Sequence, residues 1–374
     1  MSINFEIVAT LKAAKETDAF KPFEVRDFNS GWQNTRYRFN AISGTNRFQL
    51  EIAGGKWKDD KKNQILTFTR AETGKKPEKL TVKWEDRKSK EIIDQVAGYR
   101  IYTCNLLTFD ERKALEDEGK AEEAQKKNHQ FLEKTEYAAL VKRVIDSGKY
   151  VDAKFRILGT IEFQYSESKN QFYRTLSVDK MYRVADDTPC KTEMTLNAFY
   201  TEDAVDADSY DDTKKYFFNC FTDHYFSSVK ANRFVPLTLV INGNGDEKAE
   251  KKANAFKKMF EKFDDEATVR KVGLVCQMID GAESVAITYA DLDDETKENI
   301  DAGLISEEDA IKALGGNMMG NRVTEYRVQS LSRTSTKGSE PTVYTEDDIR
   351  KLPVIEEVEE EVNIFGNDDD SDDI

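Results

Sequence analysis

Alternation of apolar and polar side chains predicts strands in the first part of the chain. In the segment RFQLEI at 47–52, Phe48, Leu50 and Ile52 alternate with polar residues, which is typical of a strand with one buried face. The preceding segment TRYRFNAI is joined to it by Ser-Gly-Thr-Asn at 43–46, so the two segments predict a hairpin. ILTFTR at 65–70 and LTVKW at 80–84 continue the strand pattern, separated by lysine-rich loops.

The period then changes to that of a helix. The stretch 110–147 is rich in Glu, Lys and Ala, its later apolar residues recur at helical spacing, and Gly148 ends it. Two long alternating segments follow, at 150–165 and 171–184, with residues 166–170 as the turn between them.

The second half of the chain repeats this order without an obvious sequence repeat. Three strand-like segments over 191–241 precede a predicted helix at 246–263, and strands follow at 268–279 and 322–331. Between these last two strands lies an insertion at 291–320, which carries helix-start signals at Asp291 and Ser306.

Three strands, a helix and two strands are the order of an OB-fold, a five-stranded barrel. The sequence therefore predicts a mainly β protein with inserted helices (α+β), built as two OB-fold-like barrels; a β-sandwich is the alternative. The expected organisation is an N-terminal domain at 1–187, a second domain at 188–335, and a flexible linker with a disordered acidic tail at 336–374.

Charge is distributed unevenly along the chain. The formal net charge is -15, yet residues 21–90 contain 17 Lys and Arg against 9 Asp and Glu, and residues 356–374 contain ten acids and no base. This asymmetry is expected of a polyanion-binding protein with a detachable acidic tail. A solvated charged surface with a solubilising tail is the alternative interpretation.

Motifs for catalysis or cofactor binding are missing from the sequence. There is no GxxxxGK[ST] loop, and GNG at 243–245 lacks the third glycine of a dinucleotide fingerprint. The only two histidines, His129 and His224, are expected to be structural or exposed, and the four cysteines lack CxxC spacing and read as small buried residues. We therefore predict a non-enzymatic protein without a cofactor or metal.

The length of the apolar runs bears on the cellular compartment. No run approaches eighteen apolar residues, and the first ten residues lack the pattern of a signal peptide. We expect a cytoplasmic protein with no membrane partner.

Aromatic residues interleaved with bases form the most informative pattern. Single-stranded nucleic acid is bound by cations that neutralise phosphates together with exposed rings that stack on bases. Phe48, Tyr37 and Phe39 share strand faces with other apolar residues and are assigned to the core. The predicted contact residues are Trp32, Arg36, Arg38, Arg47, Lys56, Trp57, Lys58, Lys61 and Lys62, with Tyr173 and Arg174 as a second group.

The tail sequence EEVEEEVNIFGNDDDSDDI combines acids with apolar residues. A purely solubilising tail would not need those apolar residues, whereas a short peptide that docks in basic pockets of other proteins would. The predicted partner-binding residues are Phe365, Asp368, Asp369, Asp370, Asp372, Asp373 and Ile374.

The segment KPFEVRDFNSGWQNTRYRFNAISGTNRFQLEIAGG at 21–55 resembles the start of single-stranded DNA-binding proteins of tailed bacteriophages. The acidic end is similar to the partner-recruiting tip of bacterial and phage single-stranded DNA-binding proteins, although Ile374 stands where the common tip has Phe. The resemblance implies an OB-fold protein in the infected host cytoplasm. It would coat single-stranded DNA during replication and recombination and recruit phage or host proteins through its tail. A protein-interaction or virion-associated structural protein without a DNA role is the alternative.

Overall fold

The structure is a computed structural model that describes residues 3–71, 74–263, 268–286, 289, 292–313 and 317–354. Within these residues, 15 strands are linked by hydrogen bonds into one large sheet, which confirms the mainly β prediction. Its N-terminal strands are β1 (Ile3–Ala13), β2 (Phe23–Asp27), β3 (Trp32–Ser43), β4 (Asn46–Trp57), β7 (Tyr102–Asn105), β8 (Asn128–Phe131), β9 (Lys154–Ser166) and β10 (Gln171–Arg183). The others are β11 (Lys191–Tyr200), β12 (Val205–Asp206), β13 (Lys215–Phe226), β14 (Ala231–Asn242), β15 (Arg270–Ala286), β16 (Asn317–Leu331) and β17 (Glu340–Pro341).

The pairings of five N-terminal strands close on themselves. β1 pairs with β3, β3 with β4, β4 with β10, β10 with β9, and β9 again with β1. Only β4 and β10 run parallel in this circuit, with Leu50 beside Leu176. Phe39, Leu50 and Ile157 are 0% exposed, so the circuit encloses a core. These strands, with helix α4 (Lys134–Asp146), are called the first unit.

Five later strands repeat the same order of pairings. β11 pairs with β13, β13 with β14, β14 with β16, β16 with β15, and β15 with β11. Again the third and fifth strands of the circuit, β14 and β16, are parallel. These strands, with helix α6 (Glu247–Phe260), are called the second unit. The helix predicted at 246–263 is confirmed.

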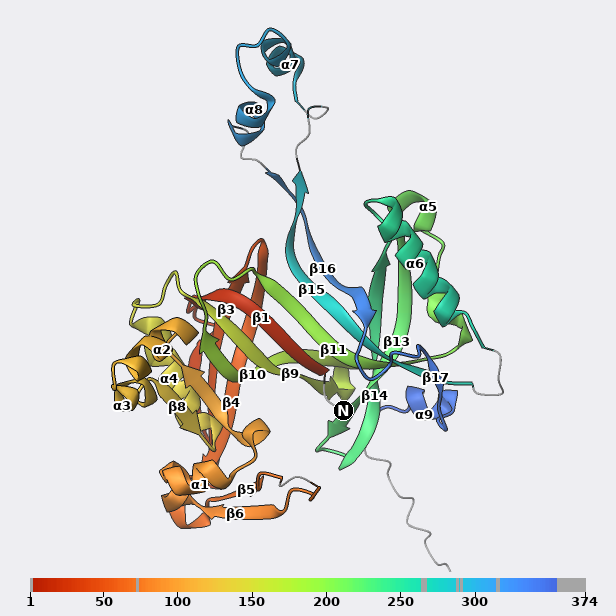
Figure 1. The fold of residues 1–374 in the computed structure, drawn as a ribbon. Helices are drawn as coiled ribbons and strands as arrows, with labels where there is room; N and C mark the ends of the chain where they lie inside the picture. The colour runs from red at the N-terminus through yellow and green to blue at the C-terminus, as the bar shows by residue number, and fades with distance from the viewer. Residues whose placement is uncertain are drawn as a thin grey trace, which may run out of the picture.

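The two units share one continuous sheet. β1 pairs with β11, with Asn4 opposite Thr195, so these strands lie side by side at the centre of the molecule (Figure 1). The β3–β4 turn also touches β15, because the Asp280 amide donates to Asn46 Oδ1 at 3.0 Å. A Cβ on Gly281 would lie 2.2 Å from the Thr45 carbonyl oxygen, so this close approach requires glycine.

The helical region of the first unit differs from the prediction of one helix over 110–147. The structure has α2 (Phe109–Asp117), α3 (Ala121–Gln125), strand β8 and then α4. Gly119 adopts a positive φ of 76° and ends α2. β8 pairs with β7, so the backbone groups of β8 make their hydrogen bonds in a sheet instead of a helix. Only α4 has a continuous apolar face, and it buries Tyr137, Val141 and Val144.

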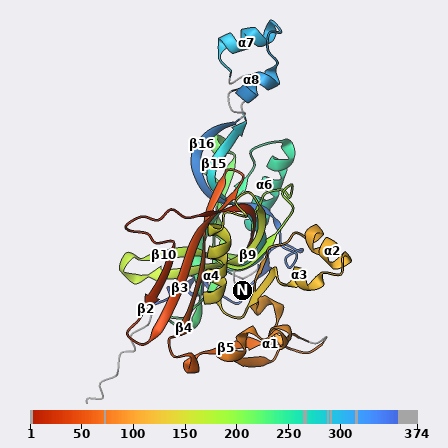
Figure 2. The ribbon, with the colours of Figure 1, turned by 90° about the vertical axis from the view of Figure 1, so that its left-hand side faces the viewer.

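The strands predicted at 65–70 and 80–84 exist, but they do not join the first unit. They are β5 (Gln64–Phe68) and β6 (Lys79–Lys83), a separate two-stranded sheet beside α1 (Lys90–Gln95), at the bottom of Figures 1 and 2. This small sheet has its own core of Val82, Ile93, Val96, Ile101 and Leu132.

Helices also occur within the segments inserted in the second unit. The acidic loop after β11 contains α5 (Tyr210–Thr213), and the insertion at 291–320 contains α7 (Asp294–Asp301) and α8 (Glu307–Ala313), which stand away from the sheet in both views. Asp293 caps the start of α7, and its side chain accepts from the Thr296 amide. Asp291, the predicted start, lies outside the described residues. Ser306 caps α8 as predicted, accepting from the Asp309 amide at 3.1 Å.

The described part of the predicted flexible linker, 336–354, is instead packed against the second unit. It contains β17, which pairs with β15, and α9 (Glu346–Arg350). Ile349 is 0% exposed and packs with Phe199, Phe234 and Val269. The prediction was wrong for this segment because its few apolar residues are too widely spaced to show a period, although Ile349 is buried in the fold.

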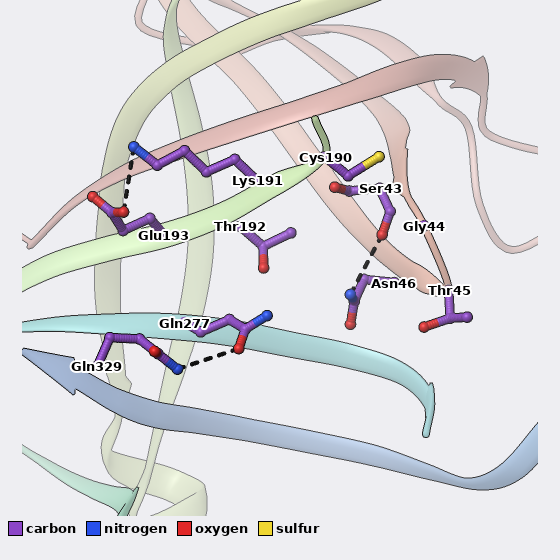
Figure 3. A pocket seen from close by; sticks show the side chains of 10 residues that line it. All are labelled: Ser43, Gly44, Thr45, Asn46, Cys190, Lys191, Thr192, Glu193, Gln277 and Gln329. Carbon is purple, nitrogen blue, oxygen red and sulfur yellow. Dashed lines mark hydrogen bonds and ion pairs between the residues drawn. The ribbon is translucent and has the colours of Figure 1, made fainter. Parts of the chain in front are cut away.

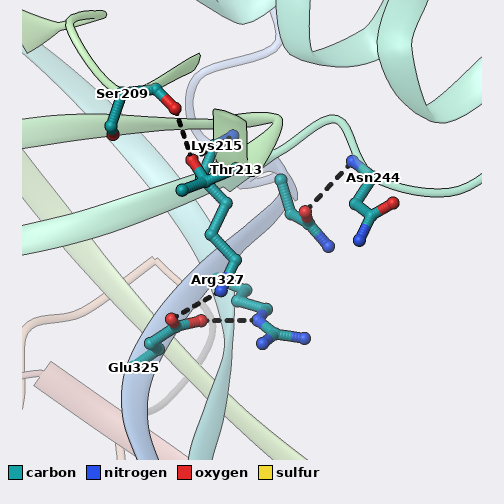
Figure 4. Close-up of polar contacts among 7 residues, drawn as sticks. Ser209, Thr213, Lys215, Asn244, Glu325 and Arg327 are labelled. Carbon is teal, nitrogen blue, oxygen red and sulfur yellow. Dashed lines mark hydrogen bonds and ion pairs between the residues drawn. The ribbon is translucent and has the colours of Figure 1, made fainter. Parts of the chain in front are cut away.

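An ion-pair network holds β13 and β16 together (Figure 4). Lys215 Nζ and Arg327 Nε each donate to Glu325 at 2.8 Å, and all three side chains are less than 20% exposed. Burial acts to raise the pKa of Glu325, but the hydrogen bonds from Lys215 and Arg327 outweigh it and lower that pKa. The carboxylate is therefore charged and stabilises this part of the second unit at neutral pH.

Candidate nucleic-acid interface

The outer face of the β3–β4 hairpin carries five of the predicted contact residues. Successive side chains of a strand point to opposite faces, and Tyr37, Phe39 and Phe48 are at most 4% exposed, as predicted for core residues. Their neighbours in sequence therefore face outward. The outward set is Trp32, Arg36, Arg38, Arg47 and Trp57.

Two arginines on this face share one carboxylate. Arg38 Nε donates to Glu51 Oε2 at 2.9 Å, and Arg36 Nε lies 3.3 Å from the same oxygen without hydrogen-bond geometry. The Arg36 side chain is 35% exposed and that of Arg38 is 22% exposed. Two guanidinium groups against one carboxylate leave a net positive charge at the surface, with the Arg36 group held less tightly.

The outer face continues into a hollow that brings four predicted residues together. This first hollow has a volume of about 450 Å³ and contains Arg36, Arg38, Tyr173 and Arg174 in its lining. Tyr173 is 42% exposed, so its ring is open to a ligand. The remaining lining residues are Phe48, Gln49, Glu51, Gln164, Thr175, Leu176, Met278, Ile279, Asp280 and Tyr326.

Arg174 connects the two units at the edge of the first hollow. Its guanidinium donates to the Tyr326 hydroxyl and lies 5.0 Å from the centre of that ring. Burial raises the pKa of Tyr326, so its hydroxyl stays protonated at neutral pH. Arg174 is thus oriented by a residue of the second unit.

A second hollow of about 610 Å³ adjoins the first. Both hollows are lined by Arg36, Glu51, Gln164 and Thr175, so they form one continuous depression, which is called the groove. The other residues of the second hollow are Asn34, Ala53, Lys134, Glu162, Phe163, Tyr165, Ser177, His224, Tyr225, Phe226, Ser227 and Ser228.

The two predicted tryptophans lie beyond the Asn34 end of the groove. Trp32 and Trp57 are paired across the hairpin, with ring centres 5.3 Å apart and an edge-to-face angle of 79°. A Cβ on Gly55 would lie 2.2 Å from the Trp32 ring, so this ring covers the glycine. Both rings are half-buried, and their contact with bases stays a prediction.

The predicted lysines are separated from the groove arginines. Lys56 lies 5.7 Å from the Trp84 ring, and Lys58 pairs with Asp27 at 3.0 Å. Lys61 and Lys62 are exposed on the short turn that leads to β5. The basic cluster of the sequence is therefore divided: Arg36 and Arg38 line the groove, and none of these four lysines does.

Arg47 lies toward the opposite end of the hairpin. Its Nε donates to Asn40 Oδ1 at 3.3 Å, and it lines neither hollow of the groove. Its contact with phosphate stays a prediction.

Another hollow of about 450 Å³ lies where the β3–β4 turn meets the second unit (Figure 3). Its lining is mostly uncharged and includes Asn46, Gln277 and Gln329. The one lysine in the lining, Lys191, forms ion pairs with Glu6 and Glu193, both at 3.3 Å. None of the predicted contact residues lines this hollow, and we assign no ligand to it.

One cysteine at this hollow corrects a prediction. Cys104, Cys220 and Cys276 are buried as expected, but Cys190 is exposed, and all four thiols are free. Burial raises the pKa of Cys104 to about 12, so that thiol is protonated at neutral pH.

The histidines have structural positions. His129 is half-buried in β8, and His224 packs edge-on against Phe163 and Phe226, with ring centres 5.5 and 4.8 Å away. Burial lowers the pKa of both imidazoles.

Within the described part of the chain, no three His, Cys, Asp or Glu side chains are grouped as metal ligands, and no helix is long and apolar enough to cross a membrane.

Several groove residues were not predicted from the sequence. Lys134 lies at the start of α4, where its Nζ donates to Ser177 Oγ at 2.8 Å and pairs with Asp179 at 3.1 Å. Gly54 of β4 packs closely against Lys134, because a Cβ at position 54 would lie 2.7 Å from Lys134 Cβ. This glycine is the feature of the sequence that could have indicated a close contact at this point of β4. Tyr225 and Tyr326 come from the second unit, and no local pattern places them beside β4.

The predicted tail residues Phe365, Asp368, Asp369, Asp370, Asp372, Asp373 and Ile374 lie outside the described residues.

The groove has the chemistry to hold a flexible chain that carries both phosphates and rings. Guanidinium groups can donate to phosphate oxygens, and the half-exposed tyrosine can stack on a base. Among its acids, Glu51 faces two arginines and Asp280 pairs with Arg322 at 2.7 Å, whereas Glu162 in the second hollow is 49% exposed and lies 3.8 Å from His224.

Comparison with known proteins gives limited information. No protein-family model matches the chain, and no curated protein matches its sequence. Two solved structures are similar to it, the wild-type single-stranded DNA-binding protein from Thermus aquaticus and a deletion mutant of that protein. The wild-type structure has 9% sequence identity and a TM-score of 0.28, with 74% of this chain and 85% of that chain covered. The deletion mutant has 6% identity and a TM-score of 0.29, with 74% of this chain and 86% of that chain covered. Similarity this low carries no argument about function.

Proposed function

We propose that this protein binds single-stranded DNA without sequence preference, along the groove. The observation that carries the proposal is the meeting of Arg36, Arg38 and Arg174 with the exposed ring of Tyr173 around one depression. Cations and rings together are what a single strand requires, because phosphates and unpaired bases alternate along it. A duplex offers phosphates but no free base faces, so it gains only the electrostatic part.

The proposed architecture is a pair of OB-folds. Each unit has five strands in a closed circuit of pairings, with a helix between the third and fourth strands and a parallel pair between the third and fifth. This arrangement supports the proposal of a five-stranded barrel, in which the second and third strands would present the ligand face. The groove lies on those strands of the first unit, β3 and β4. We assign the barrels to 1–187 and 188–335, with 336–354 as part of the second.

The proposed biological role follows from the sequence resemblance. The protein coats and protects single-stranded DNA during phage replication and recombination, in the cytoplasm of the infected host. It is not an enzyme and takes no cofactor. The tail recruits phage or host replication proteins through Phe365, Asp368, Asp369, Asp370, Asp372, Asp373 and Ile374, whose acidic and apolar residues suit basic pockets.

A titration of fluorescent oligo(dT) tests the proposal. The full chain should bind oligo(dT) more tightly than a duplex of equal length, and its affinity should fall steeply between low and high salt. The double variant Arg36→Ala/Arg38→Ala should bind more weakly, with the log–log salt slope reduced by about 1.4 if two phosphate contacts are lost.

Arg156→Ala is the matched control, since Arg156 is a strand arginine paired with Glu6 at 2.9 Å and lines neither hollow of the groove. Failure of the wild-type chain to bind oligo(dT), or equal affinity for duplex, would contradict the proposal. Such a result would favour the protein-interaction or structural alternative.

A further inference from the structure

Resting on the proposed function, we infer that Tyr225 of the second unit stacks on a base of the same strand that the first unit binds. The two units then form one composite binding site instead of two independent ones. The first hollow contains the exposed ring of Tyr173, and the second contains that of Tyr225, which is 59% exposed. Arg36 lines both hollows, so a cation lies between two rings.

The position of Tyr225 is fixed by its two neighbours in β13. His224 packs on Phe163 of β9, and the Phe163 amide donates to His224 Nε2 at 3.4 Å. Phe226, on the same face of β13 as His224, is 5% exposed and its ring centre lies 6.1 Å from that of Phe172 in β10. Both contacts attach the end of β13 to the first unit. Tyr225 is thus held at the groove by residues that are themselves buried.

Tyr225 lies on the outward face of β13. Phe226 and Tyr216, which are each 5% exposed, belong to the opposite, buried face of the strand, because successive side chains alternate. A rigidly held tyrosine loses little freedom when a ligand binds, so its stacking retains most of its free energy. Aromatic stacking also tolerates any base, which suits binding without sequence preference.

Three variants of the full chain test this inference with oligo(dT). Tyr225→Ala should lower affinity by about 5- to 150-fold, the range for loss of one stacked base. Tyr225→Phe should retain affinity, because the ring is kept. Tyr225→Trp should retain binding and add tryptophan emission that oligo(dT) quenches beyond the quenching of the wild-type protein.

Phe109→Ala is the matched control, because Phe109 is an aromatic residue that is 67% exposed on α2 and lines neither hollow of the groove. If Tyr225→Ala fails to fold, the quenching of Tyr225→Trp still decides. Affinity of Tyr225→Ala equal to that of Phe109→Ala, or no added quenching in Tyr225→Trp, would overturn the inference.

The proposed function and this inference fail in different ways. If the wild-type chain does not bind oligo(dT), the proposed function itself is wrong. If the wild-type chain binds and Arg36→Ala/Arg38→Ala weakens it, but the Tyr225 variants behave as the control, only the composite site is wrong.

Discussion

Glu51 is the residue that sets the charge of the groove. Its carboxylate lies within 3.3 Å of both Arg36 and Arg38, so it competes with any phosphate for the same guanidinium groups. It also holds Arg38 in position through a 2.9 Å hydrogen bond. The balance between these two effects can be measured.

Glu51→Gln should tighten binding of oligo(dT) at low salt by roughly fivefold, about 1 kcal/mol, because the competing charge is removed while a hydrogen-bond acceptor remains. The gain should shrink as salt is added. Glu6→Gln is the control, since Glu6 accepts from Arg156 outside the groove. Weaker binding by Glu51→Gln would mean that positioning of Arg38 matters more than competition.

The paired tryptophans give a direct optical signal. If Trp32 or Trp57 contacts bases, poly(dT) should quench the tryptophan emission of the protein. Trp32→Phe or Trp57→Phe should then lose part of that quenching. Trp84 is 8% exposed, so its emission serves as the unquenched background. The corresponding Ala variant should fold and lose about 1 to 3 kcal/mol of binding. An Ala variant that unfolds would assign its ring to the core instead.

At the scale of elements, the network that joins β13 and β16 makes stability depend on pH. The pKa of Glu325 is lowered in the folded state from its ordinary 4.5 by hydrogen bonds from Lys215 and Arg327, which outweigh burial. The stability from this group is therefore fully present above the unfolded pKa and is lost as pH falls through the lower folded pKa.

Glu325→Gln should lower the free energy of unfolding by about 1 to 3 kcal/mol at pH 7, because Lys215 and Arg327 lose the charge of this partly buried carboxylate. The difference from wild type should shrink as pH falls below 4.5. Urea titrations at pH 7 and pH 4 measure both values. A difference that grows on acidification would contradict the assigned network.

Elements with a strong local period were predicted well from the sequence. β3, β4 and β9 contain alternating segments, β10 alternates up to the register shift after Val178, and α6 has a clear apolar stripe, so the strands and the helix were expected where they occur. β1 (Ile3–Ala13) was not predicted, although every second residue from Ile3 to Leu11 is apolar and buried; it pairs with β3, β9 and β11. The break of the 110–147 helix depends on pairing of β8 with β7, which is a tertiary contact.

The site was predicted only where neighbouring residues in the sequence are neighbours in space. The hairpin register brings Arg36 and Arg38 together on one face, so alternation was enough to find them. Lys134, Tyr225 and Tyr326 reach the groove through pairing between distant strands and units. Conversely, Lys61 and Lys62 are close to the arginines in sequence but line neither hollow of the groove. Lys61 lies beside the small sheet, and Lys62 lies 5.9 Å from the centre of the Trp57 ring.

At the scale of the whole molecule, two truncations distinguish the packed C-terminal segment from the tail. Removal of 363–374 should leave thermal stability unchanged and tighten oligo(dT) binding at low salt, because a tethered polyanion competes with DNA for the same cations. It should also abolish capture of replication proteins. Removal of 336–374 should lower stability as well, because Ile349 and its contacts with Phe199 and Phe234 are lost, and burying one such residue contributes about 2 to 5 kcal/mol.

Calorimetry and oligo(dT) titration of the two truncated chains measure these effects. Weaker DNA binding after removal of 363–374 would exclude competition by the tail. Equal stability of both truncated chains would mean that α9 contributes little to the second unit.

Photocrosslinking tests most directly whether the groove is where single-stranded DNA binds. The full chain is irradiated with an oligonucleotide that contains bromodeoxyuridine, and the crosslinked peptides are identified by mass spectrometry. We predict crosslinks on the outer face of β3 and β4 and at Tyr173 of β10, reduced by an excess of unlabelled oligo(dT) and not by duplex. Crosslinks confined to surfaces outside the groove, such as α6 or the β5–β6 sheet, would contradict the assignment of the groove as the binding site.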